Sequence, residues 1–370
     1  MKQTTMLAVG MLPPPMGGQA LMFKRAIDAL QKHYDLKVID TQFQKNLGES
    51  GSFSVRKLLH FALLVGKMIP LGSMKKFDIL YYCLSGPSTL GLVKDLIFLG
   101  LLRLQARKTV YHIHGAGGVT FLMNSNFFLR AWTQLVLFEP DLILRPPSSL
   151  AESNLCKAKR EIIVDNGIED PIAMVPEPAR RWPEGELSFA FVGLVTEDKG
   201  VFDLVEIARL LRDIGHRFTL YIVGEGRPEE IARLTQLIWR YNLAEFVRLT
   251  GVLIGEQKFK LLQQTTIFLF PSYFRAETQP TAIMEALALG VPVVAYDWRG
   301  VNTIIDQGVN GYVVPPRDVD AFCRAIEQIL TNGNIDRMRT AARHIFLERF
   351  TLDRHVEALR LAFQSVDCKG

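Results

Sequence analysis

The chain has 370 residues, which is too long for one ordinary core and suits two domains. Its composition, 48% hydrophobic and 22% charged, is that of a globular protein and excludes an intrinsically disordered one. The net charge of +5 is uneven, because residues 1–170 contain 20 Lys and Arg residues against 13 Asp and Glu residues, a balance of +7. An anionic partner of this basic half (a phospholipid surface, a lipid-phosphate acceptor or an acidic glycan) and ordinary charge scatter both stay open. Nucleic acid is not expected, because the basic residues are not interleaved with aromatic ones.

The cysteines and the apolar stretches bear on the compartment. Four cysteines are far apart and form no CxxC pair, which indicates reduced thiols rather than a disulfide framework or a zinc site. The apolar run Met6–Leu12 is short and ends in prolines, which favours a buried first strand over a signal peptide. The most lipid-like stretch, Leu96–Leu102, is far shorter than the roughly 20 residues of a membrane span. We expect a cytoplasmic protein, with peripheral contact at the inner face of the membrane left open.

Short apolar runs alternate with helical patterns in the first half, which favours a parallel sheet covered by helices. An amphipathic helix is predicted at Gln19–His33. The basic, apolar segment Val55–Met68 fits either a helix resting on an anionic leaflet or a core-packed helix with a basic rim. The predicted strands are Met6–Met11, Leu36–Asp40, Ile79–Cys83, Thr109–His114, Leu142–Arg145 and Glu161–Val164.

Residues 171–187 contain four prolines among charged residues, which is typical of a linker between domains. The alternation then restarts, so we expect two Rossmann-like, doubly wound α/β domains with ligands at the carboxyl ends of their strands. Strands are predicted at Ser188–Val192, Phe218–Val223, Val247–Leu249, Ile267–Phe270, Val291–Tyr296 and Tyr312–Val314. Helices are predicted at Val201–Ile214, Glu229–Tyr241, Glu256–Gln264, Pro280–Leu289, Asp318–Leu330, Met338–Phe350 and Leu352–Ser365.

Two candidate residues or groups follow strands of the first half. Gly17-Gly18 precedes the first helix, where glycines admit a close ligand and the helix start favours anions, although a plain turn also fits. The pattern is not GxGxxG, so NAD is disfavoured. His114 ends its predicted strand and could donate to a substrate hydroxyl or transfer a proton, while a structural histidine stays an alternative. His112, two residues earlier, is expected to be structural.

The second half carries the richest candidate segment. Lys199 lies at the mouth of a helix N-terminus, a combination that attracts a diphosphate. The segment Glu277–Glu285 follows an apolar strand, and Pro280 is suited to the first helical turn. Glu277 then lies in the loop and Glu285 on the helix, so the two carboxylates could hold opposite ends of an elongated ligand.

These motifs occur in one order that resembles family 4 of the glycosyltransferases, which have the GT-B fold. The resemblance runs from about residue 7 to residue 360. Besides the motifs described above, it includes three groups of residues that begin at Asn166, Gly290 and Gly308. The matching motifs are Gly17-Gly18, His114-Gly115, Asn166-Gly167-Ile168, Gly193 with Lys199-Gly200, Glu277 with Glu285, Gly290–Val294, and Gly308 with Asn310-Gly311.

The resemblance implies a retaining sugar transfer from a nucleotide sugar, with UDP sugars favoured, to a glycan or a lipid-linked acceptor in polysaccharide or glycolipid assembly. It implies no cofactor and no obligatory metal. His114 and Glu277 would meet the donor sugar, with Glu277 also beside the diphosphate. The other donor-binding residues would be Gly17, Gly18, Lys199, Gln279, Pro280, Thr281, Ala282 and Glu285.

The same resemblance implies how the domains divide. We expect an acceptor-binding domain at residues 1–170, a linker at 171–187 and a donor-binding domain at 188–345. A terminal helix at residues 346–370 would pack back on the first domain, and the two domains would face each other across a cleft.

Two departures from the family pattern affect the groups that would bind the diphosphate. Leu194 stands where the family commonly has an arginine, so that cation would be missing or supplied by Arg275 or Arg299. Gln279-Pro280 replaces the usual Phe-Gly, and proline has no N–H to offer a phosphate. The alternatives to a glycosyltransferase are a nucleotide-sugar epimerase, a phosphorylase and a partner subunit that has lost turnover.

Overall fold

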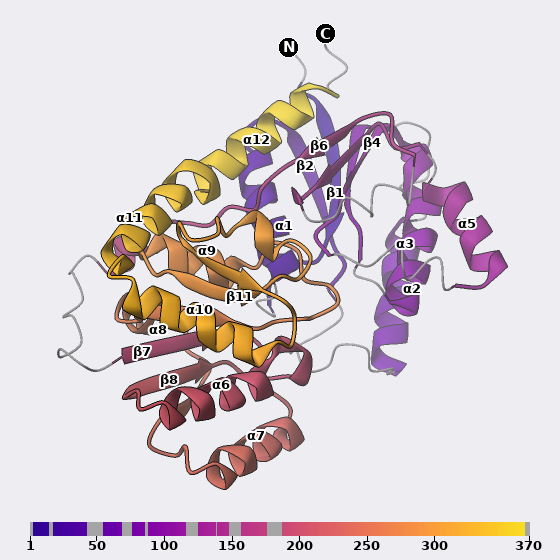
Figure 1. Cartoon of the computed structure of the whole chain (residues 1–370). Helices are drawn as coiled ribbons and strands as arrows, with labels where there is room; N and C mark the ends of the chain where they lie inside the picture. The colour runs from indigo at the N-terminus through magenta and orange to yellow at the C-terminus, as the bar shows by residue number, and fades with distance from the viewer. Residues whose placement is uncertain are drawn as a thin grey trace. The chain divides into compact units, whose positions relative to one another are not determined.

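The computed structural model describes residues 3–14, 18–42, 55–68, 76–85, 88–115, 125–137, 139–147, 157–175 and 187–366, without the side chains of residues 55–58, 60 and 67. The chain divides into two compact units, one of residues 1–166 with 355–370 and the other of residues 167–354 (Figure 1). Each unit is built on a six-stranded parallel sheet. The expected α/β fold class with two doubly wound domains is confirmed.

The first unit carries a sheet in the order β2-β1-β3-β4-β5-β6. The chain moves outward from β1 to β2, then returns to β3 on the other side of β1, so the winding reverses between β1 and β3. Open α/β sheets bind ligands outside the carboxyl ends of their strands at such a reversal. The strands are β1 Thr5–Gly10, β2 Asp35–Asp40, β3 Phe77–Cys83, β4 Ala106–His112, β5 Leu142–Arg145 and β6 Glu161–Ile163.

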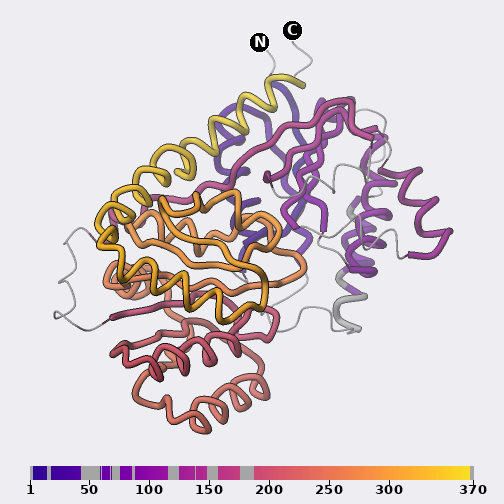
Figure 2. The backbone as a smooth tube through the Cα atoms, viewed as in Figure 1, coloured from indigo at the N-terminus to yellow at the C-terminus, as the bar shows by residue number. Residues whose placement is uncertain are grey.

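One face of this sheet is covered by two helices from opposite ends of the chain. Helix α1, Gly18–Leu30, buries Phe23 and Leu30 in a cluster that also contains Phe363 of α12, Leu352–Gln364. The ring of Phe363 meets Tyr81 of β3 edge to face at 5.2 Å between centroids. Helix α12 therefore completes the core of the first unit. Figure 2 shows the backbone of this helix, in yellow, beside the indigo start of the chain.

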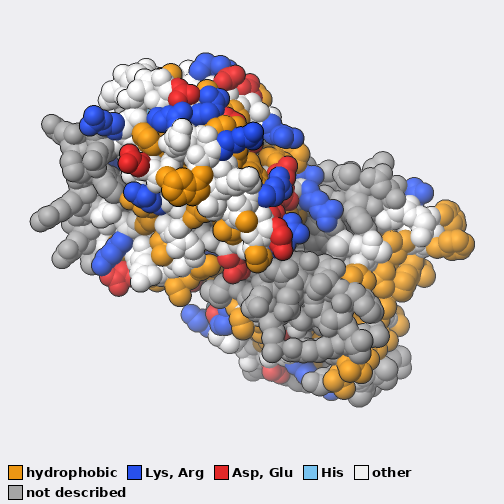
Figure 3. All heavy atoms as spheres, turned by 90° about the horizontal axis from the view of Figure 1, so that it is seen from below, with side chains coloured by type: hydrophobic (Ala, Val, Ile, Leu, Met, Phe, Trp, Pro, Cys, Tyr) orange, Lys and Arg blue, Asp and Glu red, His pale blue; other side chains and the backbone are white. Residues whose placement is uncertain are grey.

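The other face is covered by α2 Val55–Met68, α3 Thr89–Leu102 and α5 Phe127–Leu137, and both α2 and α5 pack on α3. The lipid-like stretch Leu96–Leu102 lies in α3, where four of its side chains are fully buried in the core between the helices and the sheet. No helix in the described parts of the chain is long and apolar enough to cross a bilayer. Hydrophobic side chains are also exposed on the outer side of these helices (Figure 3).

The second unit has a sheet in the order β12-β11-β10-β7-β8-β9, and its winding reverses between β7 and β10. The central strands β10 and β11 are apolar runs buried on both faces, as expected for a parallel sheet, whereas β8 has Thr219 and Tyr221 half-buried on one face. The strands are β7 Leu187–Val192, β8 Phe218–Val223, β9 Val247–Gly251, β10 Ile267–Phe270, β11 Val293–Tyr296 and β12 Gly311–Val314.

The helices of the second unit follow the predicted order with small shifts at their ends. They are α6 Val201–Asp213, α7 Pro228–Arg240, α8 Gly255–Gln263, α9 Thr281–Ala288, α10 Val319–Thr331 and α11 Ile335–Ile345, followed by a π-helical turn at Phe346–Phe350. Residues 346–354 belong to the second unit, although we expected them with the terminal helix. The reason is that Phe346 and Phe350 are fully buried in the second core.

Candidate functional site

The carboxyl edge of the first sheet carries the candidate residues of the first unit. Gly18 begins α1 after β1, and the neighbouring Gln19 donates a 2.8 Å hydrogen bond from Nε2 to the carbonyl oxygen of Leu84, just beyond β3. His114 lies two residues beyond the end of β4, and not within the strand as predicted, because the pairing with β3 ends at His112. Gly18 and His114 thus lie at one edge, beside the point where the winding reverses. Gly17 lies outside the described residues.

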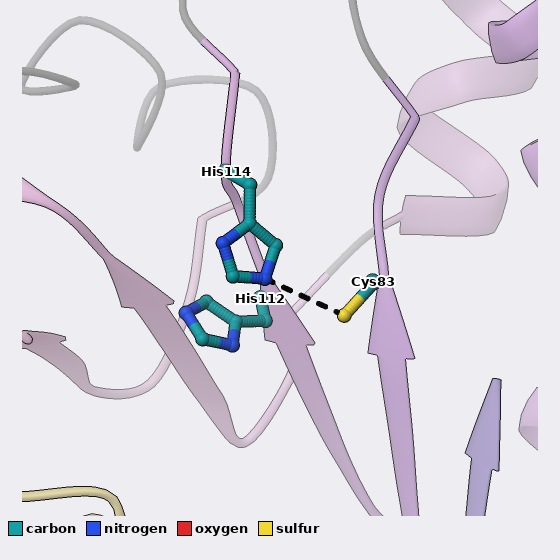
Figure 4. Close-up of side chains that lie close together, drawn as sticks. All are labelled: Cys83, His112 and His114. Carbon is teal, nitrogen blue, oxygen red and sulfur yellow. Dashed lines mark hydrogen bonds between the residues drawn. The ribbon is translucent and has the colours of Figure 1, made fainter. Parts of the chain in front are cut away.

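His114 belongs to a buried cluster with Cys83 and His112 (Figure 4). Its Nε2 lies 3.7 Å from Cys83 Sγ, and the two imidazole rings are 3.9 Å apart between centroids. His112 Nδ1 lies 2.7 Å from the Tyr81 hydroxyl, which supports the structural role expected of His112. The possible ligand atoms of the three residues lie within 4.8 Å of one another, the geometry of a potential metal site, although here they form a hydrogen-bonded network.

The cluster is held in its neutral form. Burial, aided by the nearby His355, lowers the pKa of His114 to about 3, and burial also lowers the pKa of His112 well below its usual value. Burial raises the pKa of the Cys83 thiol to about 12. At neutral pH, His114 is therefore suited to hydrogen bonding as a neutral imidazole. It is poorly suited to delivering a proton as an imidazolium ion.

The winding reversal of the second sheet places Lys199 and Glu277 together. Lys199 ends a short 3₁₀ turn after β7, Glu277 follows β10, and these two strands are neighbours. Lys199 Nζ lies 2.5 Å from Glu277 Oε2, and both side chains are largely buried. The ammonium group also lies 4.7 Å from the centroid of the Phe274 ring. The two residues that the sequence singled out separately form one ion pair.

Gly200 makes the close approach of these two loops possible. Its φ is +77°, in the left-handed region that favours glycine. A Cβ atom at this position would lie 2.0 Å from the carbonyl oxygen of Pro271, on the loop after β10. The amide of Tyr273 donates to the carbonyl of Asp198 at 2.9 Å, which joins the two loops.

Side chains around Glu277 fix its carboxylate. The hydroxyl of Ser272 donates to Glu277 Oε2 at 2.9 Å, and the Glu277 amide donates to the Phe274 carbonyl at 3.0 Å. The indole of Trp298, beyond β11, donates to the same carbonyl at 2.8 Å. The loop that carries Glu277 is therefore held by its own hydrogen bonds and by the loop that follows β11.

Helix α9 begins directly after this loop. Pro280 occupies its N-cap with φ −67° and ψ 120°, one position before the first turn where we predicted it. Extended backbone at Pro280 lets its carbonyl accept the Ile283 amide at 3.1 Å. Since the first amides of a helix have no acceptor within it, those of Thr281 and Ala282 can face an anion. Gln279, before the helix, is buried.

Glu285 lies on α9 and is paired with a residue that sequence reasoning missed. Lys258 of the neighbouring helix α8 places its Nζ 2.7 Å from Glu285 Oε1, and both side chains are largely buried. Separate cations therefore hold Glu277 and Glu285. Sequence spacing carried no signal for Lys258 or Trp298, because they come from another helix and another loop, and Ser272, in the same loop as Glu277, was not singled out.

The position of the missing arginine is filled by an apolar side chain, since Leu194 is half-buried beyond β7. The two arginines that could replace the missing one, Arg275 and Arg299, lie on loops that contact each other through Trp298. Arg275 is exposed and follows Phe274, whose carbonyl accepts from Trp298, while the guanidinium of Arg299 lies 5.6 Å from the centroid of the Trp298 ring. Both arginines thus come from loops anchored next to the Lys199–Glu277 pair.

Comparison with known proteins gives this site a context. Residues 186–332, from β7 through α10, match the family of glycosyl transferases group 1. The amylovoran biosynthesis glycosyltransferase AmsK of Erwinia amylovora is 32% identical over 209 residues, 54% of this chain and 50% of that protein. The putative colanic acid biosynthesis glycosyltransferase WcaL of Escherichia coli is 29% identical over 197 residues, 51% of this chain and 48% of that protein. The chain thus spans about half the length of the curated relatives it matches.

Solved structures share the fold over nearly the whole chain. A sucrose-phosphate synthase from Thermosynechococcus elongatus has a TM-score of 0.75 at 17% identity and covers 98% of this chain and 99% of its own. HepE of Anabaena, solved in complex with UDP, has a TM-score of 0.69 at 17% identity, over 98% of this chain and 100% of its own. Residues 186–332 are therefore a glycosyl transferases group 1 domain, carried by a chain that has the GT-B fold.

Proposed function

We propose that this protein is a retaining glycosyltransferase that moves a sugar from a nucleotide sugar to a glycan or lipid-linked acceptor in polysaccharide or glycolipid assembly. The observation that carries the proposal is the Lys199–Glu277 pair beside the start of α9, at the winding reversal of a domain matched by the family. UDP sugars are the favoured donors, and HepE, a protein with the same fold, binds UDP.

In this proposal the diphosphate lies between Lys199 and the first amides of α9. Lys199 Nζ and the amides of Thr281 and Ala282 stabilise the charge that develops on the leaving diphosphate. Glu285, oriented by Lys258, accepts hydrogen bonds from the ribose hydroxyls. Glu277 orients Lys199 and reaches the donor sugar, and the neutral His114 hydrogen-bonds to that sugar.

The chemistry then needs no separate general base on the protein. The acceptor hydroxyl attacks the anomeric carbon on the face from which the diphosphate leaves. The departing phosphate oxygen takes the proton from the acceptor hydroxyl, so the sugar keeps its anomeric configuration. The protein contributes positioning and fixed charge, and these two effects supply much of the rate acceleration of many enzymes.

A panel of UDP and GDP sugars, read by thermal shift and then by calorimetry, tests donor binding. The chosen donor is next given to Lys199→Ala, Glu285→Ala and the control Lys260→Ala, whose ion pair with Glu256 is exposed on α8. We expect the first two variants to lose about 10²-fold or more in transfer, while the control keeps its activity. Unimpaired binding and transfer in both site variants would show that the site is elsewhere.

A partner subunit that binds the donor without turnover is the second candidate. Leu194 and the N-cap Pro280 favour it, because both remove groups that would otherwise meet the diphosphate. Tight binding of a UDP sugar with no transfer across an acceptor panel would support this candidate. Conversion of the donor without any acceptor would identify an epimerase instead.

A further inference from the structure

Two neighbouring strands of the first sheet bring one thiol and two imidazoles together. Cys83 ends β3, His112 ends β4, and the register of this parallel pair sets the two residues opposite each other. His114 follows two residues later, and Figure 4 shows the three side chains gathered at the ends of these strands. The sequence disfavoured a zinc site because it has no CxxC pair, but a site of this kind needs only one cysteine.

The spacing of the three side chains fits a metal ion. Cys83 Sγ lies 3.7 Å from His114 Nε2. A zinc ion that binds one sulfur at about 2.3 Å and one nitrogen at about 2.1 Å, at a tetrahedral angle, holds these two atoms about 3.6 Å apart. The candidate ligand atoms of all three residues lie within 4.8 Å of one another. Side-chain movements of about 1 Å would therefore bring His112 into the same coordination shell.

Tyr81 supplies a hydrogen bond that supports such a site. Its hydroxyl accepts from the Cys83 thiol at 3.7 Å and lies 2.7 Å from His112 Nδ1. When a cation binds, a metal–sulfur bond forms and the thiol proton leaves to the solvent. The Tyr81 hydroxyl can then donate to the thiolate, and His112 Nδ1 becomes available to the metal. Partners of this kind orient metal ligands and raise their affinity.

We infer that Cys83, His112 and His114 form a binding site for a Zn²⁺ ion. One thiolate and two neutral imidazoles are a donor set that zinc prefers, whereas Mg²⁺ and Ca²⁺ take oxygen ligands. Three protein ligands leave the fourth tetrahedral position to a solvent molecule. His114 is 8% exposed and is the least buried of the three, so the ion would enter past it at the carboxyl edge of the sheet. The inference goes beyond the proposed sugar transfer and does not depend on it, because metal binding is measured without turnover.

Titration of the full chain with Co²⁺, a coloured substitute for Zn²⁺, tests the inference. Coordination by Cys83 should give a thiolate-to-cobalt charge-transfer band in the near ultraviolet, together with the intense visible bands of tetrahedral cobalt. An equimolar amount of Zn²⁺ should then abolish these bands. Cys83→Ser should lose the charge-transfer band. His114→Gln keeps the thiol and should bind Co²⁺ at least about 100-fold more weakly, because it lacks one ligand.

Cys323→Ser is the matched control, because Cys323 is the other buried cysteine of the described residues and lies on α10, outside the cluster. Its cobalt bands and affinity should equal those of the unmodified protein. Unfolding curves by circular dichroism establish that each variant is folded, and His114→Gln alone decides the matter if Cys83→Ser does not fold.

Three results would overturn the inference. The first is the absence of a charge-transfer band in the unmodified protein. The second is a band of undiminished height in Cys83→Ser, which would assign the thiolate to another cysteine. The third is an equal Co²⁺ affinity of His114→Gln and the unmodified protein.

Discussion

At the scale of single residues, the Lys199–Glu277 pair depends on backbone as much as on charge. The 3₁₀ turn that carries Lys199 is followed by Gly200 at its C-cap, and the loop that carries Glu277 begins with Pro271, directly after β10. Side-chain hydrogen bonds then adjust the pair, but the separation of the two loops is set by main-chain contact. A methyl group added at Gly200 should therefore disturb the site, although Gly200 contributes no side chain to it.

Gly200→Ala is expected to destabilise the second unit by about 3 kcal/mol and to weaken donor binding. The left-handed φ of +77° costs an alanine about 1 kcal/mol, and its Cβ would force the Pro271 carbonyl to move. Gly333→Ala is the control, because Gly333 also has positive φ but nothing within 4 Å of its Cβ position. Chemical denaturation measures both. Equal losses in the two variants would mean that the contact with Pro271 does not matter.

Buried histidines make the stability of the first unit depend on pH. Burial lowers the pKa of His355 to about 4 and of His114 to about 3, against about 6.5 for an unfolded chain. Above pH 6.5 both states are neutral, and stability is unaffected. As the pH falls below 6.5, the unfolded chain binds protons that the folded unit does not bind, so the contribution of His355 to stability falls until about pH 4 and that of His114 until about pH 3.

His355→Gln should reduce this pH dependence by about 1.4 kcal/mol per pH unit between pH 6 and pH 4. Glutamine can still donate to the Asp165 carbonyl that lies 2.7 Å from His355 Nδ1. The measurement is the free energy of unfolding of the first unit across this range, beside the unmodified protein. Parallel curves for the two proteins would show that His355 carries a proton in the folded state.

At the scale of elements, α8 and α9 are joined by the largely buried Lys258–Glu285 pair. Lys258→Met should destabilise the second unit by about 2 kcal/mol and lower donor affinity, because Glu285 keeps its charge and loses its partner. Lys260→Met, whose partner Glu256 is exposed on the same helix, should leave both properties unchanged. A double-mutant cycle with Glu285→Gln isolates the pair. A coupling energy near zero would show that the two residues act independently.

Strands and helices were predicted correctly where the hydrophobic pattern of a segment and its length indicated the same kind of element. The strands of both sheets were predictable because short apolar runs such as Ile267–Phe270 are bounded by turn residues, and strand and run coincide there. Helix α3 was not predicted, because it is apolar on nearly every side and its hydrophobic residues show no helical period. Helix α5 was missed as well, although Phe128, Trp132 and Leu135 follow the spacing of one helix face.

The candidate site was predictable one residue at a time but not as an arrangement. Lys199 and Glu277 could be named from their places after strands, yet their contact spans 78 positions in the chain. Cys83 and His114 come from neighbouring strands, and nothing in either segment of the sequence indicates the other. Long-range neighbours of this kind follow from strand order, which hydrophobic periodicity does not encode.

At the scale of the whole molecule, the described residues form three core clusters with separate memberships, two in the first unit and one in the second. Phe363→Ala should lower the stability of the first unit by about 4 kcal/mol, because Phe363 is fully buried against Tyr81 and Tyr34. Phe322→Ala, fully buried in the second core, should act on the second unit instead. Calorimetry should resolve which transition moves. A common shift of one transition in both variants would contradict independent units.

The return of the chain to its first unit has a consequence for biosynthesis. The first unit needs Leu359, Ala362 and Phe363 to close its core, and some 190 residues separate them from β6. A domain usually folds as a unit while the ribosome is still at work, with the N-terminal one first. Here the order of folding should be reversed. The second unit is a continuous insertion that can fold once residue 354 has emerged, whereas the first unit, although synthesised earlier, cannot complete its fold at that point. Until α12 emerges, the nascent chain exposes the apolar face of β1 and β3, and chaperone capture should be strongest in that interval.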